Sequence, residues 1–424
     1  MKFRELLMLV AMITSSFDIF LVVNIGPNFR FTQLIIILII FYILLFERNI
    51  KFRYPPFFIL LVIFFILNLF FVLNSGYIAK GLGYAAWLLF NLLTVFVINF
   101  IFYNTSNVKL LIKYYILTFV FVSIFCYLQL VAGFLGYGEN FLVTAWWIKD
   151  KVPRLNGFSY EPSFLVAYII TAWSFLALLN FKKFYLFTKS NQFVLTLSLA
   201  GTIILSGSRL GILVLLFFYL ILIVISVVRA IVKLKVPRKF DIITPFTVTT
   251  GLLLILSAII VRVIDYKILL NGLGIGTNNS SHSVSTRTNG MEAVIDLFMQ
   301  NPFSGVSLGG ISFHLAKAQG LSVDSFESAK IEGNGVIFEI FAATGILGGL
   351  LFVSYLILLA FNTYSTSRRV THDKSVLLIA TFVSLFFLWM ILQPNQNVLR
   401  PYLWIHFGVL SGLLSCYRRK VCRM

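Results

Sequence analysis

One long polar stretch interrupts an otherwise apolar chain. It reads DYKILLNGLGIGTNNSSHSVSTRTNGMEAVIDLFMQNPFSGVSLGGISFHLAKAQGLSVDSFESAKIEGN (265–334). Apolar segments of about 20 residues, the length that an α-helix needs to span a bilayer, lie on both sides of it and recur along the chain. The strands of a membrane barrel would instead be alternating segments of about 10 residues. The contrast predicts an all-α integral membrane protein whose large polar loop carries its chemistry or its partner surface.

The composition supports a membrane protein and excludes other classes. Of the 424 residues, 59% are hydrophobic and only 12% are charged, against roughly 25% charged residues in soluble proteins. The net charge of +19 does not indicate nucleic acid as a partner, because the basic residues form short clusters between apolar segments, where they set the orientation of the spans. The three cysteines lie outside the polar stretch, which excludes a disulfide framework.

About twelve membrane-spanning helices are expected from the apolar segments. We place them at residues 5–24, 32–47, 55–73, 82–103, 110–136, 162–180, 191–207, 210–228, 243–264, 334–361, 375–393 and 401–415. The chain then divides into spans one to nine (1–264), a large external loop (265–333), and spans ten to twelve with a short basic tail (334–424). Twelve spans put both termini on one side, and most Lys and Arg residues fall on that side. The positive-inside rule therefore predicts cytoplasmic termini and an external loop.

Two helix starts on the expected external face carry an arginine. A helix N-terminus has a partial positive charge and free N–H groups, and an Arg beside it suits phosphate because the guanidinium binds two oxygens at once. In RLNGFSYEPS (154–163), Arg154 precedes Glu161 at the cap position of the sixth span and Pro162 in its first turn.

In SGSRLG (206–211), Ser206 or Ser208 caps the eighth span and Arg209 stands in its first turn, where the helix dipole repels a cation. A compensating anion is one explanation for each arginine. The other is a helix cap with a nearby Arg that extends to the membrane interface.

Two further helix starts lie in or beside the long polar stretch. In STRTNGMEAVIDLFMQNP (285–302) the apolar residues recur at helical spacing, Asn289 and Glu292 resemble a capping box, and Asn301-Pro302 ends the helix. Arg287 stands just before the expected start of this amphipathic helix. The stretch EGNGVIFEIFAATGILGG (332–349) opens the tenth span. Its polar residues are Glu332, Asn334 and Glu339.

These four stretches, in this order, resemble the O-antigen ligase and polymerase superfamily, the Wzy-type membrane enzymes. The matching residues fall into four motifs: Arg154, Gly157, Glu161 and Pro162; Ser206, Ser208, Arg209 and Gly211; Arg287, Asn301, Pro302 and Gly305; and Gly345 with Gly348. The resemblance covers residues 154–349. At the position where the ligases of this superfamily carry a His, this chain has Asn334. That departure favours a repeat-unit polymerase over a ligase.

The resemblance implies glycosyl transfer in a bacterial inner membrane. The donor is a growing glycan on a polyprenyl diphosphate, and the acceptor is the next lipid-linked repeat unit. Because charge grows on the leaving diphosphate, pre-placed arginines and helix N-termini are the main catalytic requirement, and neither a metal nor a cofactor is expected. Besides membrane lipid and these two glycans, a chain-length regulator is the partner to expect.

The site residues that follow have three roles. We expect Arg154, Arg209 and Arg287 to contact the diphosphate, and Glu161 to orient or deprotonate the acceptor hydroxyl. The alternatives to Glu161 are Glu332, Glu339, His282 and His314. Further substrate contacts are expected at Tyr160, Ser208, Asn289, Glu332, Asn334 and Glu339.

Two other functions remain open. One is a ligase-type glycan transferase, and the other is a transporter or flippase for lipid-linked sugars. Many transporters have internal repeats and matched broken helices, and the sequence shows neither. It also lacks a Walker-type nucleotide loop and an Asp-x-Asp pair, and the loop holds two histidines, too few for a zinc site.

Overall fold

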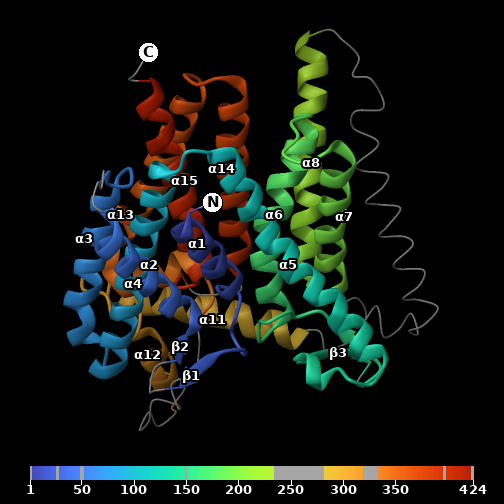
Figure 1. Cartoon of the computed structure of the whole chain (residues 1–424). Helices are drawn as coiled ribbons and strands as arrows, with labels where there is room; N and C mark the ends of the chain where they lie inside the picture. Colours follow the sequence, from blue (N-terminus) through green and yellow to red (C-terminus); the bar gives the residue numbers. More distant parts are fainter. Residues whose placement is uncertain are drawn as a thin grey trace. The chain divides into compact units, whose positions relative to one another are not determined.

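The computed structural model describes residues 2–24, 28–47, 52–148, 150–233, 281–318, 320, 333–394 and 398–421 (Figure 1). The described part of the chain is mostly helical, with thirteen α-helices. They are α1 (Phe3–Thr14), α2 (Phe31–Phe46), α3 (Phe58–Phe70), α4 (Ile78–Asn104), α5 (Val108–Phe134), α6 (Pro162–Phe181), α7 (Lys189–Leu205), α8 (Arg209–Lys233), α11 (Ser281–Gln300), α12 (Ile311–Ala318), α13 (Val336–Ser367), α14 (His372–Leu392) and α15 (Pro401–Val421). Two short 3-10 helices, η1 (Phe71–Asn74) and η2 (Glu139–Phe141), join them.

Four short strands pair as two antiparallel hairpins. β1 (Val22–Asn24) pairs with β2 (Asn28–Arg30), and β3 (Ala145–Ile148) pairs with β4 (Val152–Arg154). The all-α prediction missed both hairpins. Strands of three or four residues in connecting segments are too short to produce an alternating hydrophobic pattern.

The prediction of twelve spans is wrong for the described residues, in which six helices are long and apolar enough to cross a membrane. These six are α4, α5, α6, α8 over Arg209–Val228, α13 and α14. They indicate a multi-pass membrane protein. The helices at the second and third expected spans are apolar but shorter, α7 has 17 residues, and α15 is not among the six. The ninth expected span (243–264) lies outside the described residues.

The first expected span (5–24) shows why counting apolar segments failed. The α1 helix ends at Thr14, and the next residues are Ser15 and Ser16. The Ser15 hydroxyl donates to the Met12 carbonyl at 2.6 Å, and the Ser16 hydroxyl donates to the Ile13 carbonyl at 2.9 Å. Serine hydroxyls compete in this way for helical carbonyls. An apolar run therefore contained a helix end that composition did not reveal.

The described chain forms two compact units. The first contains Met1–Phe17, Leu21–Tyr115 and Ser283–Met424, and the second contains Asp18–Phe20 and Ile116–His282. Helix α5 begins in the first unit and continues into the second.

In the first unit, α4 packs closely against α15. Gly408 and Gly412, four residues apart, form the contact: a Cβ on Gly408 would lie 2.6 Å from the Cβ of Ile98, and one on Gly412 would lie 2.4 Å from the Cβ of Phe102. Small residues at this spacing let two apolar helices approach closely in a membrane. The Ser415 hydroxyl also donates to Asn99 Oδ1 at 2.9 Å across the same interface.

Helix α13 is broken at Gly345, where the sequence predicted one continuous span over 334–361. Gly345 has φ 64° and ψ −175°, a conformation that glycine adopts without strain. Backbone groups left free by the break bond to residues 302–307. Val306 N donates to the Ala342 carbonyl at 3.0 Å, and Ile346 N donates to the Pro302 carbonyl at 2.7 Å. The segment that follows α11 is therefore joined to the middle of α13.

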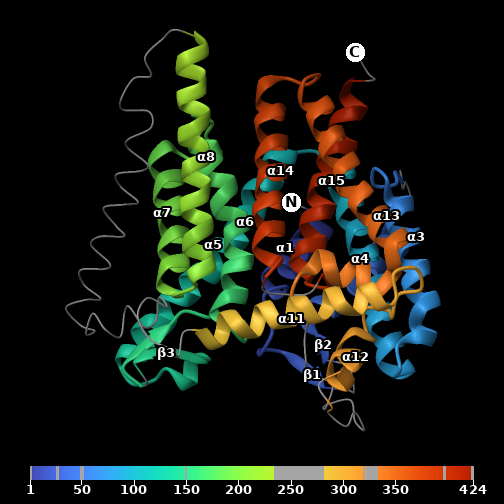
Figure 2. The same ribbon diagram turned by 180° about the vertical axis from the view of Figure 1, so that it is seen from behind.

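Helix α11 lies crosswise to α14 and α15 within the first unit (Figure 2). Its amphipathic character is confirmed, because Val294 and Leu297 are buried whereas Glu292 and Asp296 are exposed. The helix ends at Gln300, directly before the predicted stop at Asn301-Pro302. Its predicted start near Asn289 is wrong. Because α11 begins at Ser281, Arg287 and Asn289 lie inside the helix and the predicted capping box does not form its start.

The second unit is built on α6, which packs against α7 and α8 (Figure 1). Every residue from Leu165 to Leu179 is buried, so α6 has no face directed to solvent or lipid. A helix that is largely hydrophobic all round is typically buried in this way. The hairpin β3–β4 and the loop 155–161 lead into the start of α6, at the point where the predicted site residues gather.

Candidate functional site

Arg154, the last residue of β4, bonds to the end of α7. Its Nε donates to the Ser206 carbonyl at 3.0 Å, and its Nη2 donates to the Gly207 carbonyl at 3.2 Å. These carbonyls directly follow α7, where the helix dipole is negative. The guanidinium carbon also lies 5.6 Å from the centre of the Trp147 ring. Arg154 therefore holds the turn between α7 and α8 in place.

That turn delivers Arg209 to the first position of α8. Ser208 is the cap: its Oγ accepts from Gly211 N at 3.4 Å, while Ser208 N donates to Ser206 Oγ at 3.2 Å. Of the two serines that the sequence left open, Ser208 is thus the one that bonds to the helix start. Its side chain is 5% exposed, so the hydroxyl acts inside the turn rather than at an open surface.

Gly207 allows the turn to form. It has φ +66°, and a Cβ there would lie 2.3 Å from the Trp147 ring. The indole of Trp147 therefore contacts Gly207 and lies beside the Arg154 guanidinium. Trp147 stands in none of the sequence motifs, and its contact with Gly207 joins residues far apart in the chain.

The charges of Arg209 and Glu161 act on the Arg154 guanidinium. Burial lowers the pKa of the Arg154 guanidinium, the positive charge of Arg209 lowers it further, and the negative charge of Glu161 opposes both. Like charges of two arginines at one place disfavour each other. An anion bound between them would relieve that repulsion.

Glu161 and Tyr160 lie at the start of α6. Glu161 occupies the cap position in extended conformation with Pro162 in the first turn, as predicted. Its carboxylate does not bond to the helix N-terminus but accepts from the Ser163 hydroxyl at 3.0 Å, and it is exposed. The Tyr160 side chain is 63% exposed, and its carbonyl accepts from the Thr144 hydroxyl at 2.9 Å. Both side chains are accessible to a large substrate.

Asn156 holds the loop between Arg154 and Glu161. Its amide nitrogen donates to the carbonyls of Leu142 and Ser159, each at 2.9 Å, and its Oδ1 accepts from Thr144 N at 3.3 Å. The side chain is fully buried. No sequence motif singled out Asn156, because Asn in a polar loop is common and its partners are backbone atoms.

The other predicted site residues belong to the first unit. There α11 crosses the start of α13 so closely that a Cβ on Gly290 would lie 2.7 Å from Asn334 Nδ2. Glu339 is 4% exposed and folds back toward Gly333, and Ile337 N donates to Gln393 Oε1 at 3.2 Å. Asn289 is exposed one residue before the crossing.

The predicted residues therefore form two groups, one in each unit. Arg154, Tyr160, Glu161, Ser208 and Arg209 come together in the second unit. Asn289, Asn334 and Glu339 come together in the first, with Arg287 one helical turn before Gly290 in α11. Glu332 lies outside the described residues.

The two histidines of the predicted loop, His282 and His314, lie on different helices. The Nε2 of His314 on α12 contacts the Asn74 carbonyl at 3.0 Å, so that nitrogen is engaged within the fold. His282 is the second residue of α11. Within the described ranges, His, Cys, Asp and Glu form no group of three or more that would hold a metal ion.

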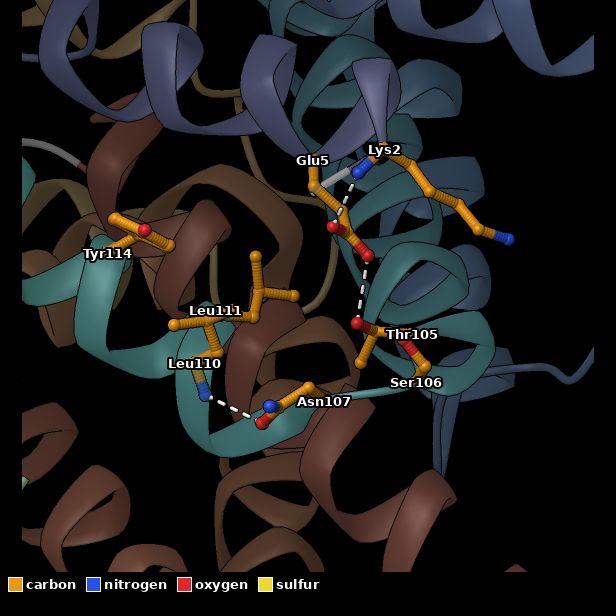
Figure 3. A pocket seen from close by; sticks show the side chains of 8 residues that line it. All are labelled: Lys2, Glu5, Thr105, Ser106, Asn107, Leu110, Leu111 and Tyr114. Atoms are coloured by element: carbon orange, nitrogen blue, oxygen red, sulfur yellow. Dashed lines mark hydrogen bonds between the residues drawn. The ribbon is translucent and has the colours of Figure 1, made fainter.

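A separate cavity of about 170 Å³ lies at the first turn of α5 in the first unit (Figure 3). Its polar lining includes Glu5, whose carboxylate accepts from Thr105 Oγ1 at 2.8 Å and from Lys2 N at 2.9 Å. Ligand pockets usually measure about 300–1,000 Å³. This cavity is therefore too small for a lipid-linked oligosaccharide.

Comparisons with protein-family models, with curated proteins and with solved structures find no match to the chain.

Proposed function

We propose that this protein is a glycosyltransferase that joins polyprenyl-diphosphate-linked oligosaccharide repeat units into a surface polysaccharide. The O-antigen-type polymers of the resembled superfamily are the first candidates. The observation that carries the proposal is the group of Arg154, Arg209 and Glu161 at the starts of α6 and α8. We place the reaction at the external face of a bacterial plasma membrane, with both termini cytoplasmic.

A diphosphate fits the cationic group better than a neutral ligand does. Arg209 stands at the positive end of α8, and its charge lowers the pKa of the nearby Arg154 guanidinium. Two guanidinium groups and a helix N-terminus together favour an anion with several oxygens. A leaving diphosphate gains charge as its bond to the sugar breaks, so the same groups bind the transition state more tightly than the ground state.

The two arginines have different roles in this proposal. Arg154 uses two of its five N–H donors on the carbonyls of Ser206 and Gly207. It therefore fixes the turn and adds its positive charge to the site. Arg209 follows the turn and is the principal contact. Arg287 lies on α11 in the first unit and remains a prediction from the sequence, separate from this group.

The reaction exchanges one bond at the anomeric carbon of the donor. An acceptor hydroxyl oxygen bonds to that carbon while the carbon–oxygen bond to the diphosphate breaks, and the diphosphate leaves with the electron pair. The hydroxyl proton passes to a base. Glu161 is the first choice, because its carboxylate is exposed at the α6 start and its negative charge reaches Arg154.

We propose the first-unit group, taken by itself, as a contact for sugar hydroxyls. Asn334 and Asn289 offer amide donors and acceptors to sugar hydroxyls, and Glu339 is a second carboxylate. An asparagine has no proton-accepting nitrogen, so Asn334 does not serve as a histidine-type base. We therefore favour the polymerase over a ligase.

The break in α13 is the one observation that favours a transporter, since discontinuous helices line the binding sites of many transporters. In those proteins the freed backbone groups face a substrate or an ion. Here Val306, Ser307 and Pro302 bond to the freed groups of α13. The break thus serves packing, and the polymerase stays the first proposal.

The test is polymerisation by purified protein. The protein is reconstituted with lipid-linked repeat units, and the products are separated by length. A polymerase gives a ladder of longer glycans on the lipid, whereas a ligase gives transfer to a different acceptor and a flippase gives neither. Arg209→Ala protein that is correctly inserted is the matched control and gives no ladder. A wild-type preparation that is folded and yet leaves the repeat unit unchanged would overturn the proposal.

A further inference from the structure

Gln129, which no motif in the sequence singled out, pairs with the loop that carries Arg154 and Glu161. It lies near the C-terminal end of α5 and is fully buried in the second unit. Its Oε1 accepts from Gly157 N at 2.8 Å, and its Nε2 donates to the Gly157 carbonyl at 2.9 Å. The same Nε2 donates to the Phe141 carbonyl at 2.7 Å. Both N–H donors and the oxygen of the side chain are used.

The hydrogen-bond partners of Gln129 indicate the role of its side chain. A buried side-chain amide costs free energy unless it is hydrogen-bonded, so an apolar residue would serve better if α5 only had to pack. Polar side chains in membrane helices commonly bond to a neighbouring helix. All three bonds of Gln129 go instead to backbone atoms of the segment between α5 and α6.

The backbone conformation of Gly157 and its lack of a Cβ permit this contact. It has φ +58°, and a Cβ there would lie 3.0 Å from Leu165 Cδ1 and 3.2 Å from Cys126 Sγ. The backbone of the loop therefore lies directly against α5 and α6 at this residue. Gly157 stands three residues after Arg154 and four before Glu161. Fixing the backbone at Gly157 therefore fixes the backbone positions from which the Arg154 and Glu161 side chains extend.

We propose that Gln129 is a positioning residue, which holds Gly157 and through it sets Glu161 relative to Arg154. The inference rests on the proposed function for its catalytic meaning. Its structural part stands on the bonds to Gly157 alone. Gln129 touches no substrate in this proposal, so its loss changes the geometry of the reacting groups and leaves the charge of the site intact.

Two variants separate the hydrogen bonds from the volume of the side chain. Gln129→Met keeps the length and loses every hydrogen bond. Gln129→Glu keeps an acceptor for Gly157 N, but its ionised carboxylate has no proton to donate to the Gly157 carbonyl. When protonated, it regains one O–H donor. Acid protonates this carboxylate, so the donor to the Gly157 carbonyl returns as the pH falls.

The activity test measures polymerisation at several pH values. We expect Gln129→Met to lower kcat by on the order of 10²-fold, the cost of misplacing reacting groups by about 1 Å. KM for the lipid-linked donor changes little, because Arg209 keeps its place. The kcat of Gln129→Glu, relative to wild type, rises as the pH falls, and that of Gln129→Met does not. A purely structural role of Gln129 would give no such rescue.

Hydrogen–deuterium exchange tests the positioning without activity. In wild type the amide of Gly157 is protected by Gln129, so the peptide covering 154–161 exchanges slowly. Exchange there rises in Gln129→Met, while a control peptide from α15 stays unchanged. Unchanged exchange in 154–161 would overturn the inference, as would faster exchange together with wild-type kcat. If wild type makes no glycan ladder, the proposed function fails, and the exchange result still decides whether Gln129 holds the loop.

Discussion

Arg154 donates from Nη2 to the carbonyl oxygen of Gly207 at 3.2 Å, and so ties the end of β4 to the turn before α8. With the Ser206 bond, this makes Arg154 the partner of two carbonyls that end α7. A charged residue in the predicted site thus also has a role in the fold. Its two roles can be separated by comparing it with Arg209.

Arg154→Lys is expected to lower both stability and activity. A lysine has no planar fork, so it does not reach both carbonyls and the Trp147 ring with the same geometry. Leaving one buried carbonyl without a partner costs about 1–3 kcal/mol. The measurement is the thermal unfolding midpoint in detergent beside the polymerisation rate. A variant with an unchanged midpoint would show that Arg154 does not hold the turn.

Arg209→Lys is expected to lower activity alone. Lysine keeps the charge but loses bidentate binding of phosphate oxygens, and loss of one such stabilising contact costs about 10²–10³-fold in kcat. The unfolding midpoint stays near that of wild type, because Ser208 still caps α8. Full polymerisation by this variant would remove Arg209 from the site.

Gly207→Ala is expected to disturb the turn by contact with Trp147. The added Cβ would meet the ring at 2.3 Å, at a backbone φ of +66° that alanine tolerates poorly. We expect a lower unfolding midpoint and a loss of polymerisation. Trp147→Ala combined with Gly207→Ala removes the clash but not the strain, so it recovers part of the midpoint. Equal midpoints for the single and double variants would contradict a role of the ring contact.

Gly345→Ala tests the break in α13. The glycine has φ +64°, and an added Cβ would lie 2.7 Å from the carbonyl oxygen of Phe303. Strain of this kind costs about 1–3 kcal/mol, measured as a lower unfolding midpoint. Gly83→Ala in α4 is the control, since no atom lies within 4 Å of the added Cβ. Similar midpoints for the two variants would count against a required break.

Removal of divalent metal is expected to leave polymerisation unchanged. In the proposed mechanism the charge on the leaving diphosphate is met by guanidinium groups and helix N-termini, and no step uses a metal. The measurement is the glycan ladder with and without a chelator, with a metal-dependent glycosyltransferase as positive control. Loss of the ladder on chelation, restored by added metal, would show that the diphosphate needs a cation as well as Arg154 and Arg209.

Local sequence signals predicted two helix starts and one helix end among the predicted site segments. Glu161 with Pro162 marks the beginning of α6, the pair Ser206 and Ser208 marks that of α8, and Asn301-Pro302 marks the end of α11. Each signal depends on the backbone bonding of a few neighbouring residues, which sequence displays directly. Of the predicted site residues, Arg209 and Glu161 affect the pKa of Arg154 through their charges, whereas Arg287 belongs to the other unit.

Contacts between distant residues were the part that sequence did not reveal. Gln129 bonds to Gly157 across 28 positions, and the break at Gly345 is joined to Pro302 and Val306. A glutamine in an apolar helix was the available signal, because it needs a buried partner. The number of spans failed for a related reason: hydropathy measures composition over a window, while Ser15 and Ser16 end a helix through specific bonds.

The break in α13 also divides the electrostatic field of that helix. Peptide dipoles add only along an uninterrupted hydrogen-bonded column, and the column is interrupted at Gly345. The carbonyls of Ala342 and Ala343 are matched by the N–H groups of Val306 and Ser307, which reduces the negative pole of the first segment. The positive pole at Asn334 thus arises from Val336–Thr344 alone, and the length of the remaining helix does not strengthen it.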